Sequence, residues 1–427
     1  MQTANKSPYQ WLLRLGPGLV FALSVVGPGD IVANAAAGSE YGYSLIWALG
    51  LTLIIRYIWI STSAKYVLVT GKTLLQGYAS VGSWVIWALF FSMILVKHLQ
   101  NVYKVALIGT TADLLYPLPH AASPTIWALL FTLSGFAMMF WGGYKTVEFF
   151  FKILIALLGA FLLVGALLSE PDISGIIRGS LIPSLPHASG LYSALFLLMV
   201  LIGTESGSMT NLTYTYFMYE KGWRDLSYLK RQRLDLAFGA GSIFLLGALL
   251  QITAAGTLGR SDAQLNGPEN LMQILVESHG SLGFTVFGLG LFAAVFTSYV
   301  GATTGYALII TDICRRLLPS IGKLFGGPGD PADIKKDPVY RWSIVFWSFS
   351  PLYILFVDAK PIPLVLLVSA LTVILIPLLA LCLLVITNRK ESMGDFRNGW
   401  FVNTVLLALV AASIYLTAVN GMGWLGL

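Results

Sequence analysis

The chain has 427 residues, of which 56% are hydrophobic and 11% are charged, and its mean hydropathy is +0.77. This composition excludes an ordinary soluble domain and indicates many membrane-spanning helices. The formal net charge of +6 could indicate a nucleic-acid partner. The basic residues lie in alternate loops, however, as membrane topology requires, so no nucleic-acid partner is expected.

Eleven apolar segments follow one another along the chain, and most are long enough to cross a bilayer. Their approximate bounds are 14–38, 43–70, 82–116, 124–143, 146–169, 188–219, 234–258, 281–314, 340–358, 361–387 and 400–424. The hydrophilic loops between them are too short to fold as separate domains. We therefore expect a single transmembrane domain over residues 1–427.

The distribution of basic residues predicts the orientation of these segments. One set of loops holds Arg178, Arg260 and Lys360, and the other set holds most of the remaining Lys and Arg. The positive-inside rule then places the N-terminus in the cytoplasm and the C-terminus outside. The first ten residues are polar and lack a signal-peptide cleavage site, so the first apolar segment is expected to remain as a span. We expect a multi-pass protein of the cell (inner) membrane.

The first apolar segment is interrupted near its middle by Gly27-Pro28-Gly29-Asp30. A Gly-Pro-Gly run removes an amide donor, clashes with the preceding turn and adds backbone freedom, so the helix should open into two halves here. A carboxylate at this depth costs about 2.5 to 3.5 kcal/mol on the lenient insertion scale. Unwound backbone is tolerated there only beside protein or a water-filled cavity. These features indicate a cation site at Asp30.

Segment six carries a second interruption, which runs from Gly203 to Asn211 and contains a glutamate and several small hydroxyl residues. Paired interruptions in two halves of a chain indicate a transporter built on inverted repeats. Repeat one is expected over about 14–169 and repeat two over about 188–387, followed by an extra helix over about 400–424. The expected fold class is an all-α integral membrane protein with 11 transmembrane helices and two inverted five-helix repeats (1–5 and 6–10), in which helices 1 and 6 are broken at the midplane.

These two breaks would meet near the midplane and place Asp30 and Glu205 around one cavity. Backbone carbonyls near Gly27, Gly203 and Thr204 would then supply further oxygen ligands for a metal. Two simpler interpretations stay open, because the Gly-Pro-Gly run could be a packing kink and Glu205 could be protonated and merely hydrogen-bonded. A carboxylate at both equivalent positions favours the cation site.

Short motifs elsewhere in the chain are specific when taken together. They are Gly-Pro-Gly at 16–18, Ala-Ala-Gly-Ser-Glu-Tyr-Gly-Tyr-Ser-Leu-Ile-Trp at 36–47, Ser-Ala-Lys-Tyr-Val-Leu-Val-Thr-Gly-Lys at 63–72, Gly-Leu-Gly-Leu-Phe-Ala-Ala at 288–294 and Thr-Thr-Gly at 303–305. With these motifs the chain resembles the Nramp family of divalent-metal transporters over nearly its whole length. The resemblance implies the LeuT-type fold, which agrees with the two inverted repeats expected above.

The chain departs from the Nramp pattern at both breaks. Nramps read Asp-Pro-Gly-Asn at the first break, whereas here the carboxylate has moved to the last position, Asp30. Their sixth helix carries Met-Pro-His; here Gly207 or Ser208 aligns with that methionine, and Met209 is a neighbour. Thioethers favour transition metals, while carboxylate, carbonyl and water suit magnesium. The chain is therefore similar to the Nramp-related magnesium transporters, with the hydroxyl of Ser208 expected to contact bound water more than the ion.

Nramps couple metal uptake to protons through acidic residues on the third helix and a histidine on the sixth. At the third-helix positions this chain has Asn101 and Lys104, and no histidine lies between Gly203 and Tyr219. The resemblance therefore implies that the proton carriers are missing and that uptake is uncoupled from protons. Lys97, Asn101 and Lys104 share one helix face. An interhelical ion pair, or snorkelling of the lysines to a membrane interface, is the alternative interpretation of that face.

The expected function is uptake of a divalent metal, foremost partly hydrated Mg²⁺, by alternating access. One alternative is a proton-coupled Mn²⁺ or Fe²⁺ transporter, which is favoured if Met209 points into the cavity. Another alternative is a non-transporting Nramp-like sensor. The lack of a long cytoplasmic tail after segment eleven argues against the sensor. We expect no enzyme, no cofactor besides the transported metal, a monomer in the bilayer, and an internal partner for Arg56 in segment two.

Overall fold

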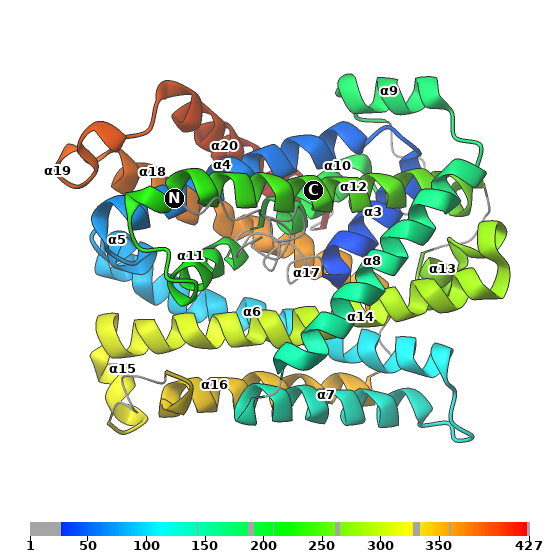
Figure 1. The fold of residues 1–427 in the computed structure, drawn as a ribbon, viewed down its shortest axis with the longest axis horizontal. Helices are drawn as coiled ribbons and strands as arrows, with labels where there is room; N and C mark the ends of the chain where they lie inside the picture. Colours follow the sequence, from blue (N-terminus) through cyan, green and yellow to red (C-terminus); the bar gives the residue numbers. More distant parts are fainter. Residues whose placement is uncertain are drawn as a thin grey trace, which may run out of the picture.

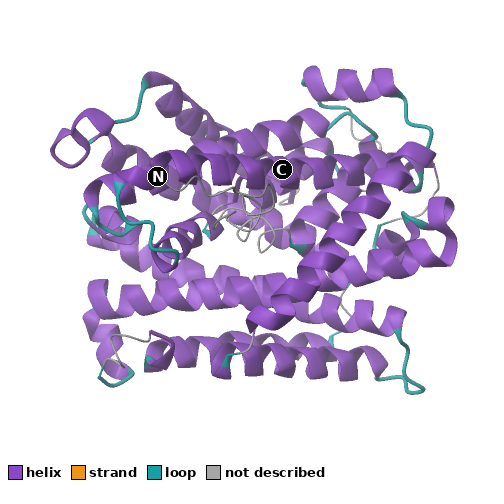
Figure 2. Ribbon diagram, viewed as in Figure 1, coloured by secondary structure: helices purple, strands orange, loops and turns teal. Residues whose placement is uncertain are grey.

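The computed structural model describes residues 27–142, 144–186, 192–207, 209–260, 265–327, 334–357 and 360–424. Within these ranges the secondary structure is helical and contains no strand (Figure 2). Nine helices in this part of the chain are long and apolar enough to cross a membrane. The composition alone had predicted this all-helical membrane architecture, and the prediction is confirmed.

The helices of the first half are, in chain order, α3 (Pro28–Tyr41), α4 (Ile46–Thr70), α5 (Leu74–Ala79), α6 (Ser83–Leu115), α7 (Ser123–Trp141), α8 (Tyr144–Leu168) and α9 (Ile173–Leu181). The sixth segment forms α10 (Ala194–Leu201), η1 (Ile202–Gly207) and α11 (Thr210–Glu220). The helices that follow are η2 (Leu226–Tyr228), α12 (Leu229–Gly256), η3 (Leu258–Arg260), α13 (Pro268–Gln273), α14 (Val276–Asp312), η4 (Ile313–Leu317) and α15 (Pro319–Leu324). The last part contains η5 (Ile334–Lys336), α16 (Pro338–Phe349), η6 (Ser350–Phe356), α17 (Pro361–Thr372), η7 (Val373–Leu375), α18 (Ile376–Asn388), α19 (Lys390–Met393), η8 (Gly394–Phe396) and α20 (Trp400–Trp424).

Where the structure describes them, the eleven predicted apolar segments each coincide with a helix or with a series of successive helices. The segment predicted over 14–38 is described only from residue 27, where it forms α3, and its first half lies outside the described residues. The segment predicted over 340–358 is α16 followed by the 3₁₀ helix η6. The short helices α5, α9, α13, α15 and α19 lie between the predicted segments, in loops.

The long helices run side by side, so that the short helices gather at two opposite ends of the molecule (Figure 1). In Figure 1, α5, α15 and α19 lie at the left end and α9 and α13 at the right end. Helices α3 and α4 both pack against α12, and α6, α7, α14 and α16 form a second packed group. The residues discussed below lie where these two groups meet.

Small residues allow the helices of each group to approach closely. A Cβ atom on Gly38 of α3 would lie 2.3 Å from the backbone oxygen of Gln251 in α12. A Cβ atom on Gly109 of α6 would lie 2.3 Å from the backbone oxygen of Pro124 in α7. Lipid tails are as apolar as Leu, so membrane helices associate through such van der Waals contacts between small residues.

Gly38→Ala should therefore lower the stability of the protein, because the added methyl group has to push α3 away from the α12 backbone. Overpacking of this kind typically costs about 1–3 kcal/mol. The matched control is Gly241→Ala in α12, where nothing lies within 4 Å of the added Cβ. We expect the midpoint of thermal unfolding in detergent to fall for Gly38→Ala and to stay or rise for Gly241→Ala. Equal midpoints would show that the α3–α12 contact is not tight.

Candidate cation site

The Gly27–Asp30 run forms the N-terminus of α3 inside the membrane domain. Gly27 is extended, with φ −113° and ψ −179°, and the helix begins at Pro28. Proline suits this first helical position because it has no amide hydrogen to leave unsatisfied. The Asp30 carboxylate accepts a hydrogen bond of 2.8 Å from the Gly27 amide, and an acidic residue in the first turn offsets the positive end of the helix dipole. The Gly27–Asp30 run therefore starts a helix within the segment predicted over 14–38.

The interruption in the sixth segment is a π-helical turn. Helix α10 ends at Leu201, the wider π-helical winding of η1 runs from Ile202 to Gly207, and α-helical structure resumes at Thr210. An unwound segment was predicted here, and the structure refines that prediction, since the chain stays wound through Gly203. π-helical turns inside α-helices are frequent at functional sites because they turn side chains and carbonyls out of register.

The two interruptions contact each other directly. A Cβ atom on Gly29 would lie 2.8 Å from the side chain of Thr204. Gly203 packs against α17, where a Cβ atom would lie 2.1 Å from the backbone oxygen of Ser369, and the Gly203 carbonyl accepts a hydrogen bond of 3.2 Å from Thr372. Both glycines are therefore required for the approach of α3, η1 and α17.

A hydrogen-bond chain joins the two carboxylate residues. The Asn34 side-chain amide donates to the backbone oxygen of Asp30 and to Oε1 of Glu205, each at 2.8 Å. Gln251 of α12 donates to Oδ1 of Asn34, also at 2.8 Å, which sets the orientation of the Asn34 amide. Glu205 is completely buried, and its Oε2 has no hydrogen-bond partner among the described residues.

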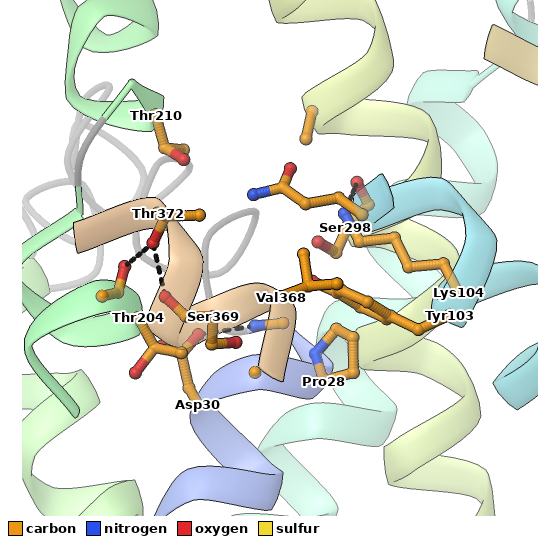
Figure 3. A pocket seen from close by; sticks show the side chains of 15 residues that line it. Pro28, Asp30, Tyr103, Lys104, Thr204, Thr210, Ser298, Val368, Ser369 and Thr372 are labelled. Carbon is orange, nitrogen blue, oxygen red and sulfur yellow. Dashed lines mark hydrogen bonds between the residues drawn. The ribbon is translucent and has the colours of Figure 1, made fainter. Parts of the chain in front are cut away.

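A polar cavity lies beside the start of α3 (Figure 3). Its lining combines glycines at both breaks with hydroxyl, carboxylate and ammonium groups from five helices and η1: Gly27, Pro28, Gly29, Asp30, Gln100, Tyr103, Lys104, Gly203, Thr204, Thr210, Ser298, Ala302, Val368, Ser369 and Thr372. The space open to the centres of water molecules is about 70 Å³, which is room for several waters.

Glu205 faces a second, smaller void instead of this cavity. That void measures about 10 Å³ and is bordered by Asp30, Asn34, Glu205 and apolar residues of α3 and α12. It has room for about one water molecule. Asp30 borders both spaces, so the two predicted carboxylates lie together but only Asp30 reaches the larger cavity.

The other predicted ligands fall into three groups. Gly27, Gly203 and Thr204 border the cavity, although the Thr204 hydroxyl donates to the Val200 carbonyl of its own helix at 3.1 Å. Met209 is completely buried in the apolar core and does not border the cavity. Ser208 lies outside the described residues.

The predicted third-helix residues lie on α6, and Lys104 is the one of them that borders the cavity. Lys104 borders the cavity and its Nζ donates to the Ser298 carbonyl of α14 at 3.2 Å (Figure 3). Asn101 is completely buried and donates to the Trp347 carbonyl of α16 at 2.9 Å. Lys97 is also completely buried, with Nζ 5.7 Å from the centre of the Tyr306 ring. These side chains therefore line the packing of α6 against α14 and α16.

Sequence reasoning missed Asn34 and Gln251, which hold the carboxylates in place. Each is a lone amide in an apolar helix, and Asn34 follows Asp30 by one helical turn, a spacing that would have indicated contact. Arg56 was expected to have an internal partner. It is 2% exposed, and it interacts electrostatically with both Asp30 and Glu205.

The sequence is similar to one family model and to named relatives over nearly its whole length. The sequence model of the family described as "Natural resistance-associated macrophage protein-like" matches residues 18–422. The divalent metal cation transporter MntH of Aeromonas hydrophila is 23% identical over 421 residues, which is 95% of each chain. The protein of the same name from Yersinia enterocolitica is 25% identical over 423 residues, covering 95% of this chain and 94% of the relative.

Solved structures agree on the fold. A structure of a manganese transporter from Eremococcus coleocola superposes with a TM-score of 0.74 at 17% identity, covering 100% of this chain and 90% of the other. Mhp1, a nucleobase-cation-symport-1 family transporter, superposes with a TM-score of 0.55 at 12% identity, covering 95% of this chain and 93% of the other. The LeuT-type fold expected from the resemblance is confirmed, and because the family model spans nearly the whole sequence, this chain belongs to the Nramp family.

Proposed function

We propose that this protein carries a divalent metal cation across the membrane and that its preferred substrate is partly hydrated Mg²⁺. The observation that carries the proposal is the position of Asp30, whose carboxylate lies at the meeting point of two interrupted helices and borders a polar cavity. An ionisable group inside a membrane domain indicates a substrate pathway. The MntH relatives are named as divalent metal cation transporters.

The chemistry of the cavity favours a hard, hydrated ion. Its lining offers one carboxylate, hydroxyls and backbone oxygens, and the space admits several waters. Mg²⁺ dehydrates reluctantly and keeps several waters while it binds one or two carboxylates. Among the described residues there is no group of three or more His, Cys, Asp or Glu that could hold a metal ion, so bound water would have to complete the coordination of an ion here. The thioether of Met209, which would favour a transition metal, packs in the apolar core.

Uptake without proton coupling is the second part of the proposal. On α6, the positions of the family's acidic residues hold Asn101 and Lys104, and Lys104 borders the cavity. A fixed ammonium there opposes the passage of a proton. A membrane potential of 100 mV is worth about 2.3 kcal/mol per charge, so a divalent cation gains about 4.6 kcal/mol. This corresponds to somewhat more than a thousandfold concentration ratio, which is enough to drive uptake alone.

A second candidate is proton-coupled Mn²⁺ transport. It is favoured by the names of the relatives, because the Eremococcus coleocola structures are described as a manganese transporter. The TM-score of 0.74 to that protein, at 17% identity, shows a shared fold alone. The two candidates differ in metal preference and in proton movement, and both differences are measurable.

For the arrangement in the cell we propose a monomer in the inner membrane with a cytoplasmic N-terminus and an external C-terminus. The end of the molecule that carries α5, α15 and α19 also carries Lys72, Lys323 and Arg389, next to or within those helices. This asymmetry supports a cytoplasmic location for that end. Alternating access would then move the group with α3, α4 and α12 against the group with α6 and α14.

Removing either carboxylate charge should abolish efficient Mg²⁺ transport. In proteoliposomes we expect Asp30→Asn to lower the rate of Mg²⁺ uptake at least about tenfold, because it removes the carboxylate at the cavity. Glu205→Gln should lower the rate similarly, because Glu205 holds the Asn34 amide beside Asp30 and loss of such an outer-shell group has this effect in other metal sites. The matched control is Asp172→Asn, which alters an exposed carboxylate just before α9 and should leave the rate unchanged. Parent-like rates in both site variants would remove the proposed site.

The variant Met209→Leu distinguishes the magnesium candidate from the manganese candidate. Leucine keeps the volume of the buried side chain, so stability should change little. If Met209 packs in the core, inhibition of Mg²⁺ uptake by added Mn²⁺ should be the same in the variant and in the parent protein. A large loss of Mn²⁺ inhibition in Met209→Leu would mean that the thioether contacts the metal and would favour the manganese candidate.

Proton coupling can be measured directly. With a pH-sensitive dye inside proteoliposomes, Mg²⁺ uptake driven by a negative internal potential should proceed without proton entry, because a divalent cation alone gains about 4.6 kcal/mol at 100 mV. Collapsing the potential should slow uptake. Proton entry in fixed proportion to Mg²⁺ would contradict the uncoupled mechanism.

A further inference from the structure

Helix α11 connects the two packed groups of helices, because it contacts both α4 and α14. Towards α4 it packs through Tyr214 and Met218, which form one apolar cluster with residues of α4. Its first turn is tied to η1, since the Asn211 side chain donates a hydrogen bond of 2.8 Å to the Ser206 carbonyl. By these contacts α11 belongs with η1 and α4.

Another face of α11 meets α14. A Cβ atom on Gly305 of α14 would lie 2.9 Å from the Thr213 side chain. Asp312 lies two helical turns further along α14, on the same face as Gly305. There Oδ2 of Asp312 accepts a hydrogen bond of 2.7 Å from the Tyr216 hydroxyl. Oδ1 of Asp312 lies 2.6 Å from Nε of Arg316. A hydroxyl, a carboxylate and a guanidinium group thus join α11 to the end of α14.

This contact lies away from the cavity. Thr210 of α11 and Ala302 of α14 border the cavity. At the rise of an α-helix, Tyr216 lies about 9 Å beyond Thr210 and Asp312 about 15 Å beyond Ala302 along their helices. Arg316 lies in η4, just before α15, so the contact lies toward the end of the molecule that carries α5 and α15 (Figure 1). It can therefore hold the helices without touching an ion in the cavity.

The charges of this contact suit an interaction that opens and closes. Asp312 is 5% exposed, and a hydrogen bond from a hydroxyl to a carboxylate is stronger than one between neutral groups. Arg316 follows Asp312 by one helical turn, and its side chain is 58% exposed, so it reaches water. When the Tyr216 hydroxyl leaves, Asp312 keeps its cation. Opening therefore does not strand a buried charge, which would be strongly destabilising.

We propose that Tyr216, Asp312 and Arg316 form a latch that holds α11 and η1 against α14 in the conformation seen here, and that releases them when the two groups of helices move apart. This inference rests on the proposed function, because alternating access supplies that movement. Helix α11 is bonded to η1, which carries Glu205 and borders the cavity through Gly203. The latch therefore acts on the metal site through α11 and sets the ratio of the two conformations.

The test variant is Tyr216→Phe, which removes the hydroxyl and keeps the ring. Its matched control is Tyr219→Phe, on the same helix. The Tyr219 hydroxyl donates at 3.3 Å to the carbonyl of Gly71, the C-cap of α4. That bond joins α11 to the group with which α11 moves, so its loss should not favour opening.

The distance between two spin labels measures opening directly. One label replaces the exposed Lys221 just after α11, the other replaces the exposed Lys323 of α15, and the buried Cys314 and Cys382 are replaced by alanine. In metal-free, full-length protein in lipid nanodiscs, we expect Tyr216→Phe to shift the ratio of the two conformations at least about tenfold toward the longer distance, because a hydrogen bond to a charged group is lost. Tyr219→Phe should keep the parent's distances.

Asp312→Asn provides a second variant, because it keeps the size of the side chain and removes the charge of the acceptor. It should shift the distances in the same direction as Tyr216→Phe. Parent-like distances in Tyr216→Phe, or an equal shift in Tyr219→Phe, would overturn the latch even where the unfolding midpoint falls. The distances are measured without metal. Parent proteoliposomes that take up no Mg²⁺ would therefore contradict the proposed function and leave the result on the latch unchanged.

Discussion

The hydrogen bonds of the Asn34 amide connect the two interrupted helices, and the arrangement of the site depends on them. One amide group contacts the Asp30 carbonyl and the Glu205 carboxylate, and Gln251 holds that amide in place. Burying a polar group without a hydrogen-bond partner costs free energy. This chain of hydrogen bonds lowers that cost for the buried Glu205 carboxylate. It also ties α3, η1 and α12 together, so the carboxylates share one frame.

Close backbone contacts set how near the interrupted helices can come. Gly29 lies against Thr204, and Gly203 lies against the Ser369 carbonyl, at distances that leave no space for a Cβ atom. Helices α3 and α12 approach equally closely at Gly38, where a Cβ atom would meet the α12 backbone. In a bilayer, such contacts replace the hydrophobic driving force that holds soluble proteins together. The glycines that interrupt the helices therefore also assemble the site.

Buried charges are divided between the two groups of helices. Asp30, Glu205 and Arg56 lie on α3, η1 and α4, whereas Lys97 and Lys104 lie on α6, which packs with α14. The cavity lies between these groups and is bordered by Asp30 on one side and Lys104 on the other. An ion in this cavity would therefore feel charges whose separation changes whenever the groups move. In the proposed mechanism, this division would link the electrostatics of metal binding to the movement of the two groups.

The amino-acid sequence by itself determined the eleven helical segments, the two interruptions and the family. Hydropathy, glycine and proline act locally, so they can be recognised at Gly27–Asp30 and from Gly203 onward without knowledge of the fold. Only the tertiary structure decided that Met209 packs in the core, that Glu205 borders a separate void and that Asn34 joins the carboxylates. The physical reason is that each residue turns a helix by about 100°. A single π-helical turn at η1 therefore changes which side chains face the cavity, and the contacts of η1 with α3, α4 and α17 select that turn.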